Sequence, residues 1–297
     1  MAQKTTKHPL AEVFGFPPDN FSAKAQHYRK HKLCPYNNRV PSCTKDKANA
    51  PLGVCSIHAG EDLAITCPIR FRQDWCIASD AAAFFFDPST NWTSLTEVRI
   101  NTASGQSAGN IDVVLVAYDD HGRIIDFGSL EVQSVYISGN IRQPFEFYLA
   151  SPEERYDMDW TDRRLYPRPD YLSSSRKRLA PQLIYKGGIL NAWRKKMAVA
   201  LHRGFYETMP ELPEVSPASA NLAWFIYDLV YDDAQNIYQL VLTRTVYTQF
   251  KPALDVITTP IPGPVEDFVA YLQDKLDEHL EEQNPPDAPI LTDIMKT

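Results

Sequence analysis

The chain has 297 residues, of which 44% are hydrophobic and 23% charged, so it can bury one or two sizeable cores. No run of about 18 apolar residues is present, which excludes a membrane-spanning helix. The N-terminus lacks the apolar segment of a secretory signal, so we expect a cytoplasmic protein. The formal net charge of −7 argues weakly against nucleic acid as a partner, unless basic residues gather locally.

All the cysteines fall in the first 76 residues, a segment rich in proline and poor in periodic apolar patterns. They are Cys34, Cys43, Cys55, Cys67 and Cys76. Because disulfides are disfavoured in a cytoplasmic protein, this cluster indicates either a structural metal site or reduced buried thiols. A segment with little core of its own would be stabilised by a bound metal. We therefore predict a Cys-rich metal-binding module over residues 1–76 and a core over residues 77–297.

Predicted helices and strands follow one another along that core. Residues 75–100 indicate a helix, a turn and a second short element. Residues 110–138 indicate two strands joined by a turn at "DDHG", because β-branched and apolar residues flank it on both sides. Residues 188–204 have apolar side chains at helical spacing and predict a helix.

The C-terminal third predicts a β-hairpin and a helix. The hairpin covers residues 221–247 and turns at residues 232–236, and Pro264 opens the helix. One face of this helix carries Phe268, Val269, Leu272, Leu276 and Leu280, a stripe more typical of plain core than of an interface. Mixed strands and helices of this kind predict an α/β fold with a mixed sheet flanked by helices.

Three polar side chains interrupt the two predicted strands of residues 110–138. Glu131 and Gln133 are two residues apart, so they share one face of their strand, and Asp112 on the preceding strand can lie close to both. Two carboxylates at this place would suit Mg²⁺. The pattern resembles the PD-(D/E)xK nuclease site written as D…ExQ, with Ile111 in the place of the usual proline. The alternative is an ordinary strand edge that faces solvent.

The first 71 residues strengthen the resemblance. They contain the segments "FGFPPDN", "CPYNN", "CTKDK", "GVCS" and "ITCPIRF". Together with the D…ExQ pattern, these look like the NotI family of type II restriction endonucleases over roughly residues 10 to 135. The resemblance implies a PD-(D/E)xK core preceded by a metal-binding fold built by four cysteines, which holds iron in that family.

The resemblance also implies roles for individual residues. The family has an additional glutamate about fifteen residues before the aspartate, and Glu97 stands at that distance from Asp112. Asp112 and Glu131 would ligate catalytic Mg²⁺, and Glu97 would complete the acidic cluster. Gln133 takes the place of the usual lysine, and since an amide is neither a base nor charged, it can only hydrogen-bond water or phosphate. The structural iron or zinc ligands would be Cys34, Cys43, Cys55 and Cys67, with His27, His31 and His58 as fallback ligands.

A basic stretch supports DNA as the substrate. Residues 163–203 contain eleven Lys or Arg and one acid, whereas residues 207–297 contain sixteen acids and four bases. Such a stretch can bind phosphates inside an acidic protein, although it can also be a solvated face. The favoured contacts lie in the segment "YLSSSRKRLAP", predicted as a loop, and shortly after it. They are Arg176, Lys177, Arg178, Arg194 and Lys195.

The resemblance therefore predicts Mg²⁺-dependent hydrolysis of double-stranded DNA at a GC-rich palindromic site. A palindrome is cut most simply by a two-fold dimer, so we expect a homodimer. A cognate methyltransferase would be a genetic rather than a physical partner. Two alternatives remain at this point: a DNA-binding or regulatory protein of the same fold without cleavage, and a metal-stapled structural domain unrelated to DNA.

Overall fold

The computed structural model describes residues 7–47 and 49–283. Contacts divide the chain into two units, residues 1–258 and 259–297. The first unit is built around a six-stranded mixed sheet with the strand order β13-β12-β11-β8-β7-β6. The second contains helix α10 (Val265–Gln283). No helix within the described ranges has both the length and the apolar character needed to cross a membrane.

The six strands of the main sheet differ in their direction of pairing. They are β6 (Trp92–Asn101), β7 (Ser107–Tyr118), β8 (Ile124–Gln133), β11 (Met197–His202), β12 (Leu222–Asp232) and β13 (Ile237–Thr248). Strand β11 is parallel to β8 and to β12, and the other neighbours are antiparallel. The predicted turns at residues 119–122 and 232–236 are confirmed, since they join β7 to β8 and β12 to β13.

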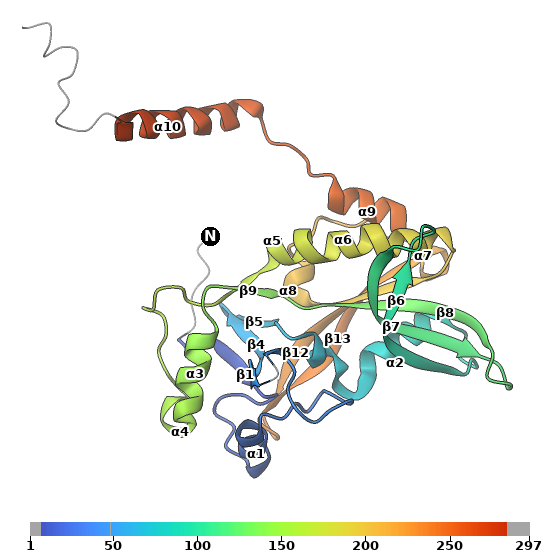
Figure 1. Cartoon of the computed structure of the whole chain (residues 1–297), viewed down its shortest axis with the longest axis horizontal. Helices are drawn as coiled ribbons and strands as arrows, with labels where there is room; N and C mark the ends of the chain where they lie inside the picture. The colour runs from blue at the N-terminus through green and yellow to red at the C-terminus, as the bar shows by residue number, and fades with distance from the viewer. Residues whose placement is uncertain (1–6, 48, 284–297) are drawn as a thin grey trace, which may run out of the picture. The chain divides into compact units, whose positions relative to one another are not determined.

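Alternate residues of the sheet build two cores, one on each face. Helix α2 (Cys76–Phe85) packs on the face that carries Leu130, Val132 and Ala200. The opposite face carries Val114 and Val199 and is covered by a helical run and α9 (Phe250–Thr258) (Figure 1). Residues Asp112, Glu131 and Gln133 belong to this second face by the alternation of side chains along a strand.

The helical run contains short α and π segments in direct succession. They are α5 (Tyr171–Ser174), η2 (Ser175–Leu179), α6 (Ala180–Gln182), η3 (Leu183–Gly187) and α7 (Gly188–Ala192). Pro181 has no N–H to donate to the preceding turn, which disturbs regular α-helical hydrogen bonding here. The segment "YLSSSRKRLAP" is therefore helical, and its prediction as a loop is wrong.

The Cys-rich region forms a small sheet with helical connections. Strands β1 (Leu10–Val13), β4 (Val54–Ala59) and β5 (Asp62–Ile65) pair in the order β1-β4-β5. Its other elements are α1 (Ala23–His31), the short pair β2 (Asp46–Lys47) and β3 (Ala50–Pro51), and η1 (Pro68–Trp75). Val135 N–H donates to the Ile65 carbonyl, which ties this region to the segment after β8.

The remaining short elements lie in the connections between β8 and β11 and between β11 and β12 of the main sheet. They are β9 (Tyr136–Ser138), α3 (Arg142–Ala150), α4 (Pro152–Arg155), β10 (Arg168–Asp170), α8 (Arg203–Tyr206) and η4 (Pro217–Ser219). Strands β9 and β10 pair antiparallel, so the segment just before the helical run lies beside the segment that follows β8.

One further prediction from the sequence differs from the structure. The helix predicted over residues 188–204 ends at Ala192, and residues 197–202 form the inner strand β11. Every residue of this strand is buried, and a short apolar run buried on both faces has no period that separates a strand from a helix. Within its own unit, helix α10 leaves its apolar stripe accessible, with Phe268 59% and Leu272 48% exposed.

Candidate active site

The predicted acidic site lies where the pairing between β7 and β8 ends. The last paired residues of that ladder are Val113 and Leu130. Beyond them, the Asp112 carboxylate accepts a hydrogen bond from Val132 N–H at 2.8 Å, so a side chain takes over from the backbone ladder. At this opening between two inner strands, Asp112 and Glu131 lie on the same face of the sheet, near enough for the Asp112 carboxylate to raise the pKa of Glu131.

Glu131 is fully buried, and its carboxyl is influenced by both an acid, Asp112, and a base, Lys186. Lys186 Nζ, from η3, donates to Glu131 Oε2 at 2.5 Å and to the Asn110 carbonyl at 2.8 Å. Burial raises the pKa of Glu131 to about 8, the adjacent Asp112 carboxylate acts in the same direction, and Lys186 opposes both. A divalent cation bound by the two carboxyls would remove their repulsion, so this pair is suited to Mg²⁺.

Gln133 is buried on the same strand and has a fixed orientation. Its Nε2 donates to the Ser134 carbonyl at 2.8 Å, and this hydrogen bond fixes the direction of the acceptor Oε1. Gln133 Oε1 and Glu131 Oε1 are both buried without a hydrogen-bond partner among the described residues. Buried polar atoms of this kind normally have a partner, so these two oxygens are suited to a metal, a water or a substrate group. The alternative of a solvent-facing strand edge does not describe these side chains, because β8 is an inner strand.

Glu97 lies at the rim of this arrangement. Its place in the β6–β7 register, between the pairs Thr96–Val113 and Val98–Ile111, is opposite Asp112. Its backbone φ is +57°, which interrupts the regular strand, and its exposed carboxylate is 3.7 Å from Arg39 Nη1. Glu97 is therefore near Asp112 in the sheet, and its carboxylate is paired with Arg39 instead.

Lys186 is the site residue that the sequence pattern missed. It is 4% exposed and comes from 53 residues beyond Gln133, on an element with no motif of its own. The only signal in the sequence is a single lysine within the apolar segment "QLIYKGGIL". A lysine in such a segment is rarely buried unless its charge is paired, and here the partner is the central acid of the site.

The four cysteines Cys34, Cys43, Cys55 and Cys67 line one small cavity. Burial raises the pKa of the Cys55 thiol well above its usual range, and proximity to Glu12 and to the other three thiols adds to this effect. Among the described side chains, no three His, Cys, Asp or Glu already have an arrangement that would hold a metal ion. The donor set nevertheless fits zinc or iron, because four adjacent thiols are the ligands of structural sites for these ions.

Other candidate ligands lie outside this cavity. Cys76 begins α2, where its thiol is near Asp80 and Asp74. His27 and His31 contact each other on α1, with their rings tilted by 49° and the ring centroids 4.7 Å apart. His58 lines a different cavity together with His8. The structure thus separates the four proposed cysteine ligands from Cys76 and from the three fallback histidines.

Lys45 is one of two cations among the described residues that line the cysteine cavity, and the other is Arg70. Its Nζ donates to the Val54 carbonyl at 2.6 Å and to Thr66 Oγ1 at 3.1 Å. Burial lowers the pKa of Lys45, and the nearby Cys67, Cys55 and Cys43 thiols act in the opposite direction. A buried ammonium beside these thiols favours their thiolate form, which is the form that binds metal.

The predicted DNA-binding residues fall into two groups. Arg176, Lys177 and Arg178 lie on η2, and the guanidinium of Arg178 is 5.1 Å from the centre of the Tyr136 ring. Tyr136 follows closely on Gln133, so this group is on the side of the acidic site. Lys195 instead pairs with Asp126 at 2.5 Å, near the start of β8, and Arg194 precedes it. The structure therefore does not bring the two groups together.

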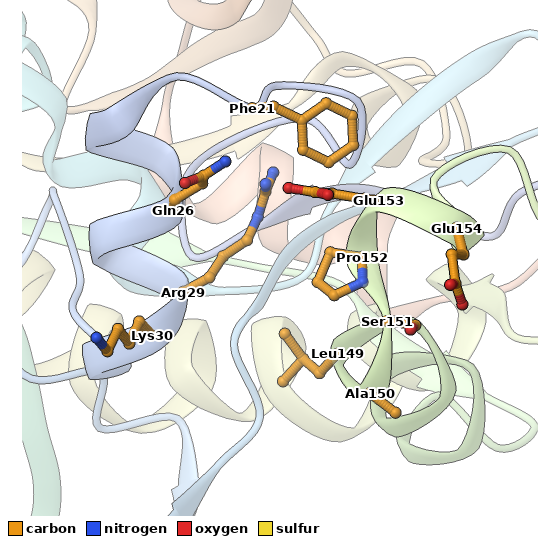
Figure 2. Close-up of a pocket in the computed structure, with 10 residues that line it drawn as sticks. All are labelled: Phe21, Gln26, Arg29, Lys30, Leu149, Ala150, Ser151, Pro152, Glu153 and Glu154. Atoms are coloured by element: carbon orange, nitrogen blue, oxygen red, sulfur yellow. The ribbon is translucent and has the colours of Figure 1, made fainter.

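A cavity of about 430 Å³ lies elsewhere, between α1 and the α3–α4 segment (Figure 2). Arg29 enters it from α1, but its terminal nitrogens donate to the carbonyls of Asn20 and Pro17. None of the predicted site residues lines this cavity. Cavity size alone therefore does not identify the site in this fold.

A mixed sheet that carries a half-buried and a buried carboxyl on adjacent strands, beside a buried lysine, is suited to the hydrolysis of phosphate esters. The family model described as "Restriction endonuclease NotI" matches residues 19–240 of this chain. The chain therefore belongs to the NotI restriction endonuclease family, whose members are nucleases that act on DNA. The comparison with curated proteins gives no match.

Proposed function

We propose that the chain is a type II restriction endonuclease of the PD-(D/E)xK kind that cuts double-stranded DNA at a GC-rich palindromic site with Mg²⁺. The observation that carries the proposal is the placement of Asp112 and Glu131 on one face of two adjacent inner strands, where Asp112 accepts from Val132 N–H and the buried Lys186 holds Glu131. A protein that only bound DNA would gain nothing from placing carboxylates next to phosphates, since like charges repel.

The proposed reaction is hydrolysis of a phosphodiester bond. Asp112 and Glu131 would hold Mg²⁺, and Gln133 Oε1 would accept a hydrogen bond from the attacking water. Mg²⁺ bound there would polarise a phosphoryl oxygen and acidify the water. Glu97, at the rim, would bind further water or a second ion. The side-chain amide of Gln133 is neutral, and its Nε2 donates a hydrogen bond to the Ser134 carbonyl. Gln133 would therefore orient the water without taking its proton.

One digest tests this proposal against a DNA-binding protein that does not cut. Plasmid DNA is incubated with the protein, with and without Mg²⁺, and the ends of any fragments are sequenced. We expect discrete fragments with identical ends in Mg²⁺ only. Binding to plasmid without cleavage under every divalent ion would instead favour the silent binding protein.

DNA contact is proposed through the two basic groups named above. Arg176, Lys177 and Arg178 would bind the backbone near the cut, because η2 lies on the side of the acidic site. Arg194 and Lys195 would reach phosphates further along the duplex. Most such contacts position the protein, and only Arg or Lys side chains that reach guanine edges in the major groove read the sequence.

We propose that Cys34, Cys43, Cys55 and Cys67 bind one structural iron or zinc ion. Protein purified without chelator should contain about one equivalent of metal per chain by elemental analysis. Cys55→Ser and Cys67→Ser should lose most of it, because each removes one of four ligands. Cys76→Ser is the matched control and should retain the full equivalent. Less than about half an equivalent in the unmodified protein would contradict the site.

We propose that the active form is a homodimer with one active site per strand. Sedimentation on a short cognate duplex should give two chains per duplex. The exposed apolar face of α10 is the candidate surface, so Leu272→Glu should weaken assembly, whereas Gln273→Glu on the same helix should not. One chain per duplex with a single nicked strand would contradict the dimer. A dimer that tolerates Leu272→Glu would assign the interface elsewhere.

A further inference from the structure

Lys186 occupies the centre of the acidic site without belonging to its sequence motif. Its Nζ is 2.5 Å from Glu131 Oε2 and 2.8 Å from the Asn110 carbonyl. It therefore links β8, which carries Glu131, to β7, which carries Asp112. An ammonium carries three hydrogens, and these two acceptors use two of them. The third is available to a water or a phosphate oxygen.

The surroundings of Lys186 fix its position. It lies in η3, a π-helical segment, and segments of this kind occur often at functional sites. The adjacent Gly187 packs so tightly that an added Cβ would lie 2.5 Å from the Phe250 ring. The close approach of η3 to α9 and to the sheet therefore holds the lysine against Glu131.

The partners of Glu131 show what this contact does. Oε2 is held by Lys186, whereas Oε1 is buried without a partner, as is Gln133 Oε1. A hydrogen bond to one carboxylate oxygen restricts rotation of the group and so favours one direction for its other oxygen. Such partners orient metal ligands, and their loss typically costs about 10- to 100-fold in metal affinity or activity.

We propose that Lys186 is the positioning cation of the active site, in the role that a lysine at position 133 would otherwise fill. It holds Glu131 Oε2 so that Oε1 faces the metal and the water. It also offsets the repulsion between the buried Glu131 carboxylate and the half-buried Asp112 carboxylate. This inference rests on the proposed nuclease function and adds to it a residue from outside the motif. The cation is Lys186 from the helical segment η3, whereas the strand position usual for lysine holds the neutral Gln133.

The test compares single-turnover cleavage and metal-free DNA binding in matched variants. Lys186→Met should cleave about 100-fold more slowly in saturating Mg²⁺ and bind cognate duplex within about 3-fold of the unmodified protein. Lys251→Met, an exposed lysine on α9 with the same loss of charge, should cleave normally. Lys186→Arg should recover part of the lost rate, because it restores a cation to the same place.

Restoring the cleavage rate with a lysine placed at position 133 distinguishes a positioning role of Lys186 from a purely structural one. Gln133→Lys combined with Lys186→Met should cleave at least about 10-fold faster than Lys186→Met alone, because the second lysine reaches the same carboxylate from β8. Near-normal cleavage by Lys186→Met would overturn the proposal. So would a folded double variant that binds DNA and stays as slow as Lys186→Met. If the unmodified protein cuts no DNA in any divalent ion, the proposed function itself fails.

Discussion

Asp112→Asn is expected to reduce cleavage of cognate DNA by about 1000-fold while leaving specific binding within a few-fold. The change removes the negative charge that Mg²⁺ requires, and loss of one group that stabilises charge in a transition state costs roughly 10²- to 10³-fold. The amide can still accept the hydrogen bond from Val132 N–H, so the end of the β7–β8 ladder should persist. Single-turnover cleavage and gel-shift binding without metal measure the two effects.

The control for this prediction is Asp120→Asn, on the exposed turn of the same hairpin. It carries the same charge change and should cleave at the normal rate. Glu131→Ala should be as inactive as Asp112→Asn, since it removes the second ligand. Near-normal cleavage by either site variant would exclude these carboxylates as the metal ligands.

The site could be predicted to the extent that it depends on neighbouring strands. The turn at residues 119–122 makes β7 and β8 adjacent, and the two-residue spacing puts Glu131 and Gln133 on one face. From these facts alone, Asp112 had to lie near both. Likewise, the cavity shared by Cys34, Cys43, Cys55 and Cys67 agrees with their prediction as a group.

Lys186 could not be predicted by the same reasoning, because its approach depends on tertiary packing. It reaches Glu131 only because β11 inserts between β8 and β12 and the helical run crosses that face of the sheet. The sequence pattern predicts a loop over residues 171–181 and a helix over residues 188–204, so no predicted element contains Lys186. A strand buried on both faces has no polar alternation to reveal it.

The exposed face of α10 shows the opposite limit of sequence patterns. The apolar spacing correctly predicts a helix, but it does not say what covers the apolar face. A stripe on a helix that packs in its own chain and a stripe that meets a second chain have the same period. The choice between them is a question of assembly, which the sedimentation experiment addresses.

Arg70→Met is expected to lower the free energy of unfolding by about 3 to 5 kcal/mol. Arg70 and Glu12 are both fully buried, and Arg70 Nε donates to both Glu12 oxygens, at 2.9 and 3.0 Å. Removing one partner leaves the other as an uncompensated buried charge, which accounts for the size of the effect. Urea denaturation followed by circular dichroism measures it. Arg123→Met, on the exposed β7–β8 turn, is the matched control and should change stability by less than about 0.5 kcal/mol.

The double variant Glu12→Leu with Arg70→Met separates lost charge pairing from lost packing. With both charges gone, no unpaired ion remains, so the double variant should be more stable than Arg70→Met alone. A double variant less stable than either single change would mean that packing and the neutral contacts dominate. Those contacts include the hydrogen bond from Arg70 to Gln73 within η1 and the one to the Tyr238 carbonyl, which joins η1 to β13. Since Arg70 also lines the cysteine cavity, loss of this pair should loosen the cavity and lower its metal content together with stability.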